Sequence, residues 1–124
     1  MASEYNGKFV EGMLSAALAE LTAAGLKDVR VVRTPGAFEI PVVVAAMARA
    51  KRRRPEVVIC LGVIFRGETA HADQVGGTVS RLLGEIAIET GVPVIHEVLL
   101  LANEAQAKKR CLADKYNRGR EAAV

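Results

Sequence analysis

The segment IFRGETAHADQ, residues 64–74, holds one of only two histidines in the chain. An apolar run ends there at an arginine and a glycine, and a polar turn follows. His71, with Asp73 two residues later, could act as a general acid or base near neutral pH, with a carboxylate available to orient the ring. A histidine at this place could equally cap a helix or fill a surface turn. No serine or cysteine nucleophile lies nearby, so the residues alone leave both interpretations open.

The turn RGETAH, residues 66–71, also suits an anion. Free backbone N–H groups of a turn and of the first helical residues attract negative charge, and a phosphate is the favoured ligand. Gly67 would let the backbone approach a ligand closely, Thr69 could add a hydroxyl, and Arg110 could supply a cation. The nucleotide motifs GxxxxGK[ST] and GxGxxG are absent. Because many helix starts bind nothing, the turn indicates a phosphate site without establishing one.

Two further polar residues lie among apolar neighbours. Glu39, in GAFEIP, follows a Pro/Gly turn and precedes a helix, so its carboxylate either caps that helix or accepts hydroxyl hydrogen bonds from a polyol ligand. His96 lies in VPVIHEVLL, where a partly buried histidine with a structural role is the more common case. Cys60 and Cys111 show no metal-binding spacing, and we expect two buried, reduced thiols.

The composition predicts a globular chain with one domain, residues 1–124. It is 51% hydrophobic, 25% charged and only 4% aromatic, unlike a disordered chain. A net charge of +3 is too small for a dedicated nucleic-acid binder. No apolar run approaches the ~20 residues of a membrane span, and no signal peptide is visible. We therefore expect a cytoplasmic protein with neither nucleic acid nor membrane as a partner.

Hydrophobic periodicity predicts helices that alternate with strands. Helices are expected at residues 9–21, 41–53, 75–91, 103–113 and from 117 onward, and strands at residues 29–32, 56–65 and 92–101. This order predicts a parallel sheet with helices on both faces and the unbroken apolar strand 56–65 in its centre. Three strands make a narrow sheet for so many helices. The basic run KRRRP, residues 51–55, is expected to be a solvated helix end.

Ligands of such sheets bind beyond the carboxyl ends of the strands, which here are followed by TPGAFE, RGETAH and LLLANE. PGAFEIP, LGVIFRGETAH with Asp73, GVPVI and EAQAKKR…NRG occur in the order and at about the spacings of the 6,7-dimethyl-8-ribityllumazine synthases of riboflavin biosynthesis. The chain resembles this family over essentially all its residues. The resemblance implies an α/β three-layer sandwich with a parallel, flavodoxin-like sheet of four strands, the first of which is not visible in this sequence.

The resemblance also implies a reaction. The family condenses 5-amino-6-ribitylaminouracil with 3,4-dihydroxy-2-butanone 4-phosphate to give 6,7-dimethyl-8-ribityllumazine, phosphate and water, with no cofactor and no metal. His71 would assist proton transfer, with Asp73 close behind it. The phosphate-binding positions would be Gly67, Glu68, Thr69 and Arg110. The positions that bind the ring and the ribityl chain would be Tyr5, Asn6, Ala37, Phe38, Glu39, Val63, Ile64 and His96.

The resemblance further implies partners. Family sites form between neighbouring subunits of a pentamer, which stays alone, pairs into a decamer or builds an icosahedral shell, so we expect a homopentamer with small-molecule substrates and riboflavin synthase as a candidate partner. The alternative is a non-catalytic relative that binds lumazine or riboflavin, or forms shells. A weaker one, an unrelated enzyme with a phosphate ligand, rests on fold analogy alone.

The sequence departs from the family pattern at several positions. His96 stands where the family has a phenylalanine, Glu97 where it has a glycine, and Arg118 where it has a lysine. The family also carries a strand before the position of Tyr5 and a last helix that usually continues beyond that of Val124. We therefore expect a sheet without its first strand and a shortened last helix.

Overall fold

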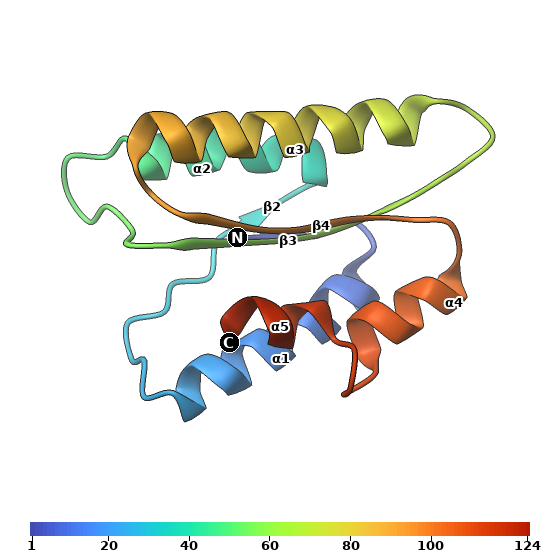
Figure 1. Cartoon of the computed structure of the whole chain (residues 1–124), viewed down its shortest axis with the longest axis horizontal. Helices are drawn as coiled ribbons and strands as arrows, with labels where there is room; N and C mark the ends of the chain where they lie inside the picture. Colours follow the sequence, from blue (N-terminus) through green and yellow to red (C-terminus); the bar gives the residue numbers. More distant parts are fainter.

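The computed structural model describes all 124 residues and has three layers (Figure 1). A parallel four-stranded sheet lies between two layers of helices. On one face lie α2 (Ile40–Ala48) and α3 (His71–Thr90), and on the other lie α1 (Gly7–Ala23), α4 (Glu104–Ala107) and α5 (Arg118–Ala123). The predicted α/β sandwich is thereby confirmed.

The sheet has the strand order β2-β1-β3-β4. β3 (Val58–Phe65) and β4 (Val94–Leu101) pair along their whole length. β1 (Ala2–Ser3) lies between β2 (Arg33–Thr34) and β3, and its Ala2 is paired with residues of both neighbours. β3 is therefore a central strand, as its unbroken apolar sequence predicts.

Two strand predictions are wrong. The chain has four strands rather than three, because the two-residue β1 precedes Tyr5. So short a strand carries no periodic signal, and only its neighbours on both sides define it. The strand expected at residues 29–32 does not form there, and β2 begins at Arg33, directly after the end of that range. The reason is register: β1 starts opposite Arg33, so residues 29–31 have no strand beside them.

The predicted helices agree with the structure better than the predicted strands do. Gly91 ends α3 in the left-handed conformation, with φ 71°, and the Asn103 side chain caps α4. The helix expected from Pro41 begins earlier, as the 3-10 turn η1 (Ala37–Glu39), and α2 ends before the basic run. The fourth helix continues past α4 as the π turn η2 (Lys108–Leu112). No helix has the length and apolar character that a membrane span requires.

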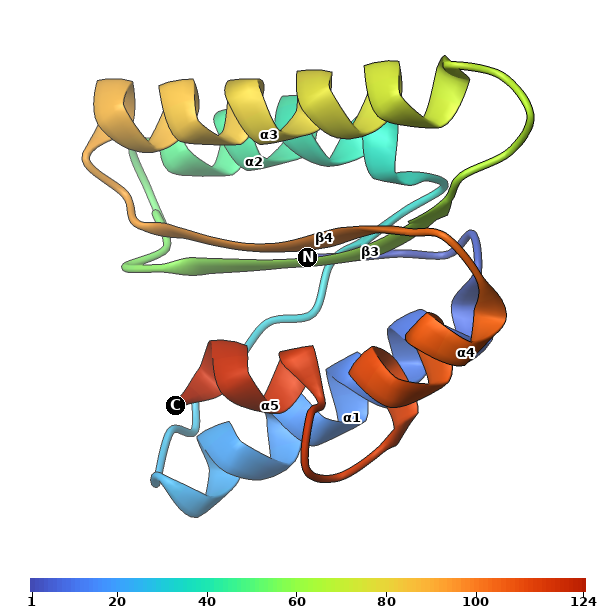
Figure 2. The ribbon, with the colours of Figure 1, turned by 45° about the vertical axis from the view of Figure 1, so that its right-hand side comes forward.

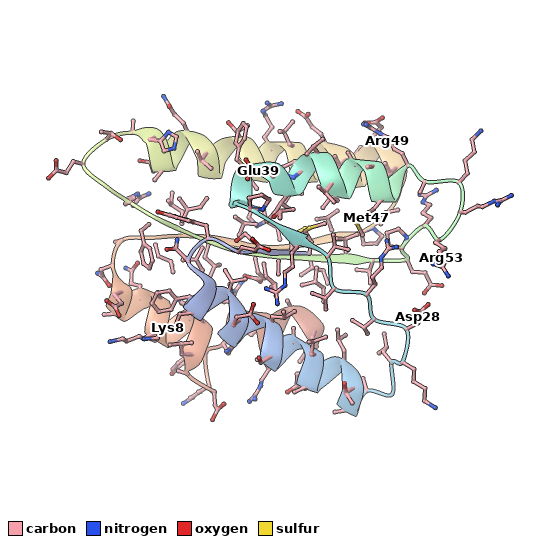
Figure 3. All side chains as sticks on the ribbon, turned by 180° about the vertical axis from the view of Figure 1, so that it is seen from behind. Lys8, Asp28, Glu39, Met47, Arg49 and Arg53 are labelled. Atoms are coloured by element: carbon pink, nitrogen blue, oxygen red, sulfur yellow. The ribbon has the colours of Figure 1, made fainter.

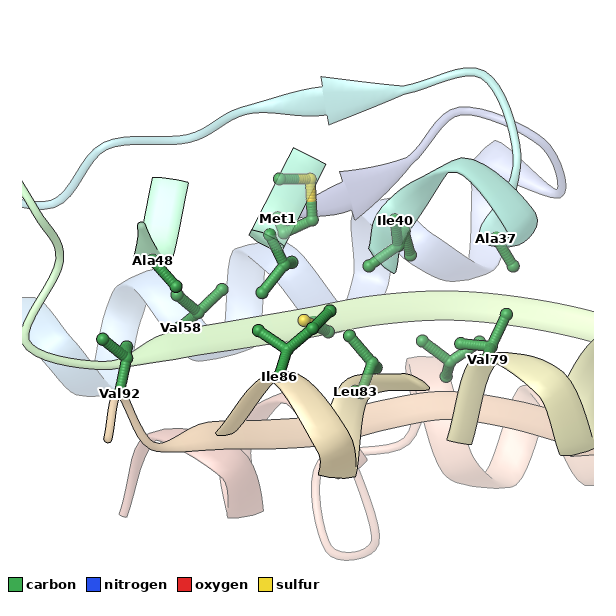
Figure 4. Close-up of a cluster of buried hydrophobic side chains, with 12 residues drawn as sticks. Met1, Ala37, Ile40, Ala48, Val58, Val79, Leu83, Ile86 and Val92 are labelled. Carbon is green, nitrogen blue, oxygen red and sulfur yellow. The ribbon is translucent and has the colours of Figure 1, made fainter. Parts of the chain in front are cut away.

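Separate apolar clusters fill the two sides of the sheet. Figure 4 shows the cluster on the α2 and α3 side, which includes Ile40 of α2, Leu83 of α3 and Val58 of β3. On the other side α1 packs against the sheet, and α5 and α4 lie beside α1 (Figure 2). Both cysteines are buried free thiols, as expected. Burial raises the pKa of Cys60 to about 12.

Candidate active site

A cleft of about 450 Å³ opens where β1, β2 and β3 end. Its walls come from three segments that are far apart in the sequence: the turn after β1, the turn after β2, and the end of β3 with the start of α3. This is the place where parallel sheets bind their ligands. Eight of the predicted site residues line the cleft, namely Tyr5, Asn6, Ala37, Phe38, Glu39, Val63, Ile64 and His71.

Four lining residues were not predicted, namely Gly36, Phe65, Ala72 and Val75. Three of them adjoin a predicted residue in the sequence, and Val75 lies one helical turn after His71. Their contribution to the wall follows from that adjacency, which is the signal that could have found them.

Asn6 joins the turn after β1 to the end of β3. Its side-chain Nδ2 donates a hydrogen bond to the Val63 carbonyl oxygen at 2.7 Å. Its backbone is left-handed, with φ 57°, a conformation that asparagine adopts more readily than most residues. The neighbouring Tyr5 N–H donates to the Pro35 carbonyl at 3.0 Å, and the Tyr5 side chain is 74% exposed. The turn is thus fixed on two sides while the tyrosine ring stays open to a ligand.

Glu39 ends the turn that follows β2. Figure 3 labels it at the start of the segment that leads into α2. Its Oε2 accepts a hydrogen bond from the Gly36 N–H at 2.9 Å, and the Thr34 hydroxyl donates to the Gly36 carbonyl at 3.0 Å. Glu39 therefore caps the 3-10 turn η1 and makes no side-chain capping hydrogen bond to α2, the helix that follows it. Because Glu39 also lines the cleft, its second oxygen is available for a ligand hydroxyl.

His71 is the first residue of α3 and lines the cleft. Its backbone N–H donates to the Thr69 hydroxyl oxygen at 3.4 Å. The predicted phosphate positions Gly67, Glu68 and Thr69 are exposed in the turn just before it and do not line the cleft. A Cβ built at Gly67 would meet nothing within 4 Å, so the backbone there is open to an approaching ligand.

Asp73 is paired with Arg66 rather than with His71. Its Oδ1 lies 3.1 Å from both Nε and Nη2 of Arg66. Both side chains are more than half exposed, so the pair contributes little to stability. We expected Asp73 to orient the His71 ring, but in the structure its carboxylate contacts Arg66. Instead the carboxylate holds a cation at the start of the turn RGETAH, and Arg66 is a candidate site residue that the sequence analysis missed.

Besides Asp73 and the three turn residues, two more predicted site residues lie outside the cleft, on elements that do not line it. His96 is in the middle of β4, where its Nε2 lies 2.7 Å from the Ser80 hydroxyl of α3 and its Nδ1 accepts a hydrogen bond from the Val98 N–H at 3.1 Å. Since Nδ1 accepts, a neutral ring carries its proton on Nε2 and donates to Ser80. Arg110 is exposed in η2, on the opposite helical layer from α3. No group of three or more His, Cys, Asp or Glu residues is arranged to hold a metal ion.

The sequence matches the family model described as 6,7-dimethyl-8-ribityllumazine synthase over residues 1–124. It is 38% identical to the 6,7-dimethyl-8-ribityllumazine synthase of Kineococcus radiotolerans, in an alignment that covers 100% of this chain and 76% of the relative. The synthase of Syntrophus aciditrophicus is 38% identical, with coverages of 98% and 79%. That of Pyrococcus furiosus is 36% identical, with coverages of 100% and 76%.

Proposed function

The chain belongs to the 6,7-dimethyl-8-ribityllumazine synthase family, which serves riboflavin biosynthesis, and on that premise we propose that it is an active synthase. The reaction would condense 5-amino-6-ribitylaminouracil with 3,4-dihydroxy-2-butanone 4-phosphate to give 6,7-dimethyl-8-ribityllumazine, phosphate and water. The main support is the cleft, which brings Asn6, Glu39 and His71 together from three distant segments.

The ring of the ribitylaminouracil would lie over the end of β3, against the main chain of Val63 and Ile64 and beside the exposed Tyr5 ring. The ribityl chain would run along the turn after β2, where Glu39 offers a carboxylate oxygen to its hydroxyls. The cleft volume of about 450 Å³ suits a ligand of this size.

The phosphate of the second substrate would bind at the start of α3, because the first N–H groups of a helix have no partners within it. Thr69 and Arg66 lie in and beside this turn and add a hydroxyl and a cation. Condensation of an amine with a ketone forms a C=N bond, releases water and requires proton transfers. His71, at the end of the turn, would carry these protons. Holding both substrates side by side would supply much of the remaining rate.

A homopentamer is part of this proposal. His96 and Arg110 lie outside the cleft of their own chain, so a neighbouring copy would have to supply them if they contact substrate. Native mass measurement of the purified chain tests this, and a monomer with full activity would contradict it.

The direct test gives the purified chain both substrates and follows the fluorescence of the lumazine. The absence of product at high enzyme concentration would exclude a synthase. The alternative is a relative that binds lumazine or riboflavin without turning substrate over. It is favoured by the position of His96, which contacts the Ser80 hydroxyl and does not line the cleft. Tight binding of 6,7-dimethyl-8-ribityllumazine without turnover would establish that alternative.

A further inference from the structure

The turn between β2 and α2 contains a glycine at the wall of the candidate active site. Gly36 directly precedes η1 and lines the cleft. Figure 4 shows η1 with Ala37 labelled on it. The Gly36 backbone is extended, with φ −135° and ψ 177°, a conformation open to any residue. Because glycine has the widest choice of backbone conformations, contacts from other residues must hold the turn in this one.

The peptide groups on both sides of Gly36 are held by hydrogen bonds. In the peptide group before it, the Pro35 carbonyl oxygen accepts a hydrogen bond from the Tyr5 N–H at 3.0 Å. In the peptide group after it, the Gly36 carbonyl oxygen accepts one from the Thr34 hydroxyl at 3.0 Å. Together these two contacts fix both dihedral angles of the glycine, and its N–H therefore points in one direction.

The Gly36 N–H in turn orients the Glu39 carboxylate, whose Oε2 accepts its hydrogen bond at 2.9 Å. One carboxylate oxygen is thereby used inside the turn, and the other remains for a ligand in the cleft. The fit is close, because a Cβ at Gly36 would lie only 2.9 Å from that Oε2. The contact therefore requires a glycine, and the freedom of that glycine has to be removed by its neighbours.

Thr34 acts on this turn from a buried position. Its side chain is only 2% exposed and does not line the cleft. Valine has nearly the same shape and is as well suited to a strand, so packing alone does not require a hydroxyl here. A buried hydroxyl is costly unless it is hydrogen-bonded, and that of Thr34 makes one hydrogen bond, to the Gly36 carbonyl. The hydroxyl therefore serves the turn rather than the core.

We propose that Thr34 is a positioning residue for the ribityl chain of the substrate. Its hydroxyl locks Gly36, and Gly36 holds one oxygen of Glu39, so that the other oxygen faces the ligand hydroxyls. This inference rests on the proposed function, in which Glu39 binds the ribityl chain. Ordering the carboxylate in advance removes the cost of fixing it when the ligand binds. Thr34 thus sets the affinity for the polyol chain without touching it, and leaves the affinity for the ring unchanged.

The first test compares two ligands by fluorescence titration: 6,7-dimethyl-8-ribityllumazine and 6,7,8-trimethyllumazine, which carries a methyl group in place of the ribityl chain. Thr34→Val should weaken binding of the ribityl ligand about fivefold and leave that of the trimethyl ligand within about twofold. Thr34→Ser keeps the hydroxyl and should restore the affinity. Equal weakening for both ligands, or none for the ribityl ligand, would overturn the proposal.

A matched control removes a similar hydroxyl elsewhere. The Thr90 hydroxyl donates to the Ile86 carbonyl at 2.7 Å near the end of α3, and Thr90 does not line the cleft. Thr90→Val should leave the affinities for both ligands within about twofold of those of the unmodified chain. A loss of ribityl affinity as large as that in Thr34→Val would show a general effect of losing a hydroxyl and would count against the proposal.

The second test repeats Thr34→Val in a Glu39→Ala chain. Because Thr34 acts through the Glu39 carboxylate, its substitution there should change the ribityl affinity by less than about twofold. A further fivefold loss would show that Thr34 acts independently of Glu39 and overturn the inference. If the unmodified chain binds both ligands equally, the proposed ribityl site itself is wrong, and the inference falls with it. If the unmodified chain prefers the ribityl ligand and Thr34→Val does so equally, the inference alone fails.

Discussion

The Arg118 guanidinium holds the Glu97 carboxylate through two hydrogen bonds, 2.9 Å from Nε to Oε2 and 2.8 Å from Nη2 to Oε1. Glu97 is only 5% exposed on β4, and Arg118 opens α5. The hydrogen bond to Glu97 raises the pKa of Arg118. These positions are two of those at which the sequence departs from the family it resembles. Each of these two departures accounts for the other, because Glu97 and Arg118 form an ion pair that connects α5 to the sheet.

The first prediction concerns this pair. Arg118→Leu leaves a buried carboxylate without its cation and should lower the free energy of unfolding by roughly 2–4 kcal/mol. The double variant Glu97→Leu/Arg118→Leu should lose less than Arg118→Leu alone, since no buried charge remains. Urea denaturation of the three proteins measures the difference. A double variant less stable than the single one would contradict the role given to the pair.

The second prediction separates the two contributions of Asn6. Asn6→Gly keeps access to the left-handed backbone but loses the hydrogen bond to Val63, so it should cost about 1 kcal/mol of unfolding free energy. Asn6→Ala also strains the backbone and should cost about 1 kcal/mol more than the glycine variant. Chemical denaturation compares the two. Equal stability would mean that the positive φ carries no strain.

Long periodic segments were predictable from the sequence because their own residues determine them. β3 is one case, with its unbroken apolar run, and α3 is another, with its stripe and its terminal Gly91. β1 and β2, of two residues each, were not predictable, because pairing with neighbours rather than local pattern defines them.

The candidate site divides in the same way. Motif positions on the turns and on β3 lie together because the ends of parallel strands meet at one edge of the sheet. Side-chain partners were not predictable from spacing. Asp73 pairs with Arg66, and His96 contacts Ser80, because the folded chain brings these partners within hydrogen-bond distance.

The third prediction depends on the pairing of Asp73 with Arg66. If the proposed reaction is correct, His71→Ala should lower kcat by roughly 10²–10⁴ while its native mass stays that of the unmodified protein. Asp73→Asn should leave the pH profile of kcat unchanged, because its carboxylate contacts Arg66 and not the imidazole. Initial rates measured across pH 5–9 would decide the matter. A shifted profile in Asp73→Asn would show that the carboxylate acts on His71 after all.

The fourth prediction follows from the buried Cys60 thiol. Burial raises its pKa from 9.0 to about 12, so the unfolded chain loses this proton at lower pH than the folded chain. The contribution to stability is complete below pH 9 and falls by about 1.4 kcal/mol per pH unit above it, until the folded pKa is reached. Urea denaturation from pH 8 to 11 should show a shallower decline in Cys60→Ala. Identical slopes in both proteins would refute the assignment.

The fifth prediction concerns the contact of α5 with α1. A Cβ at Gly119 would overlap the Met13 carbonyl oxygen of α1, which is backbone and cannot rotate away. Gly119→Ala should therefore push α5 outward, strain the ion pair of the adjacent Arg118 with Glu97, and cost about 3 kcal/mol or more. Gly84→Ala on α3 is the matched control. Its Cβ would meet nothing within 4 Å, and the loss of a helical glycine should raise stability by about 0.5–1 kcal/mol. Thermal and urea unfolding should move the two variants in opposite directions, and a Gly119→Ala protein as stable as the parent would mean that α5 does not pack on Met13.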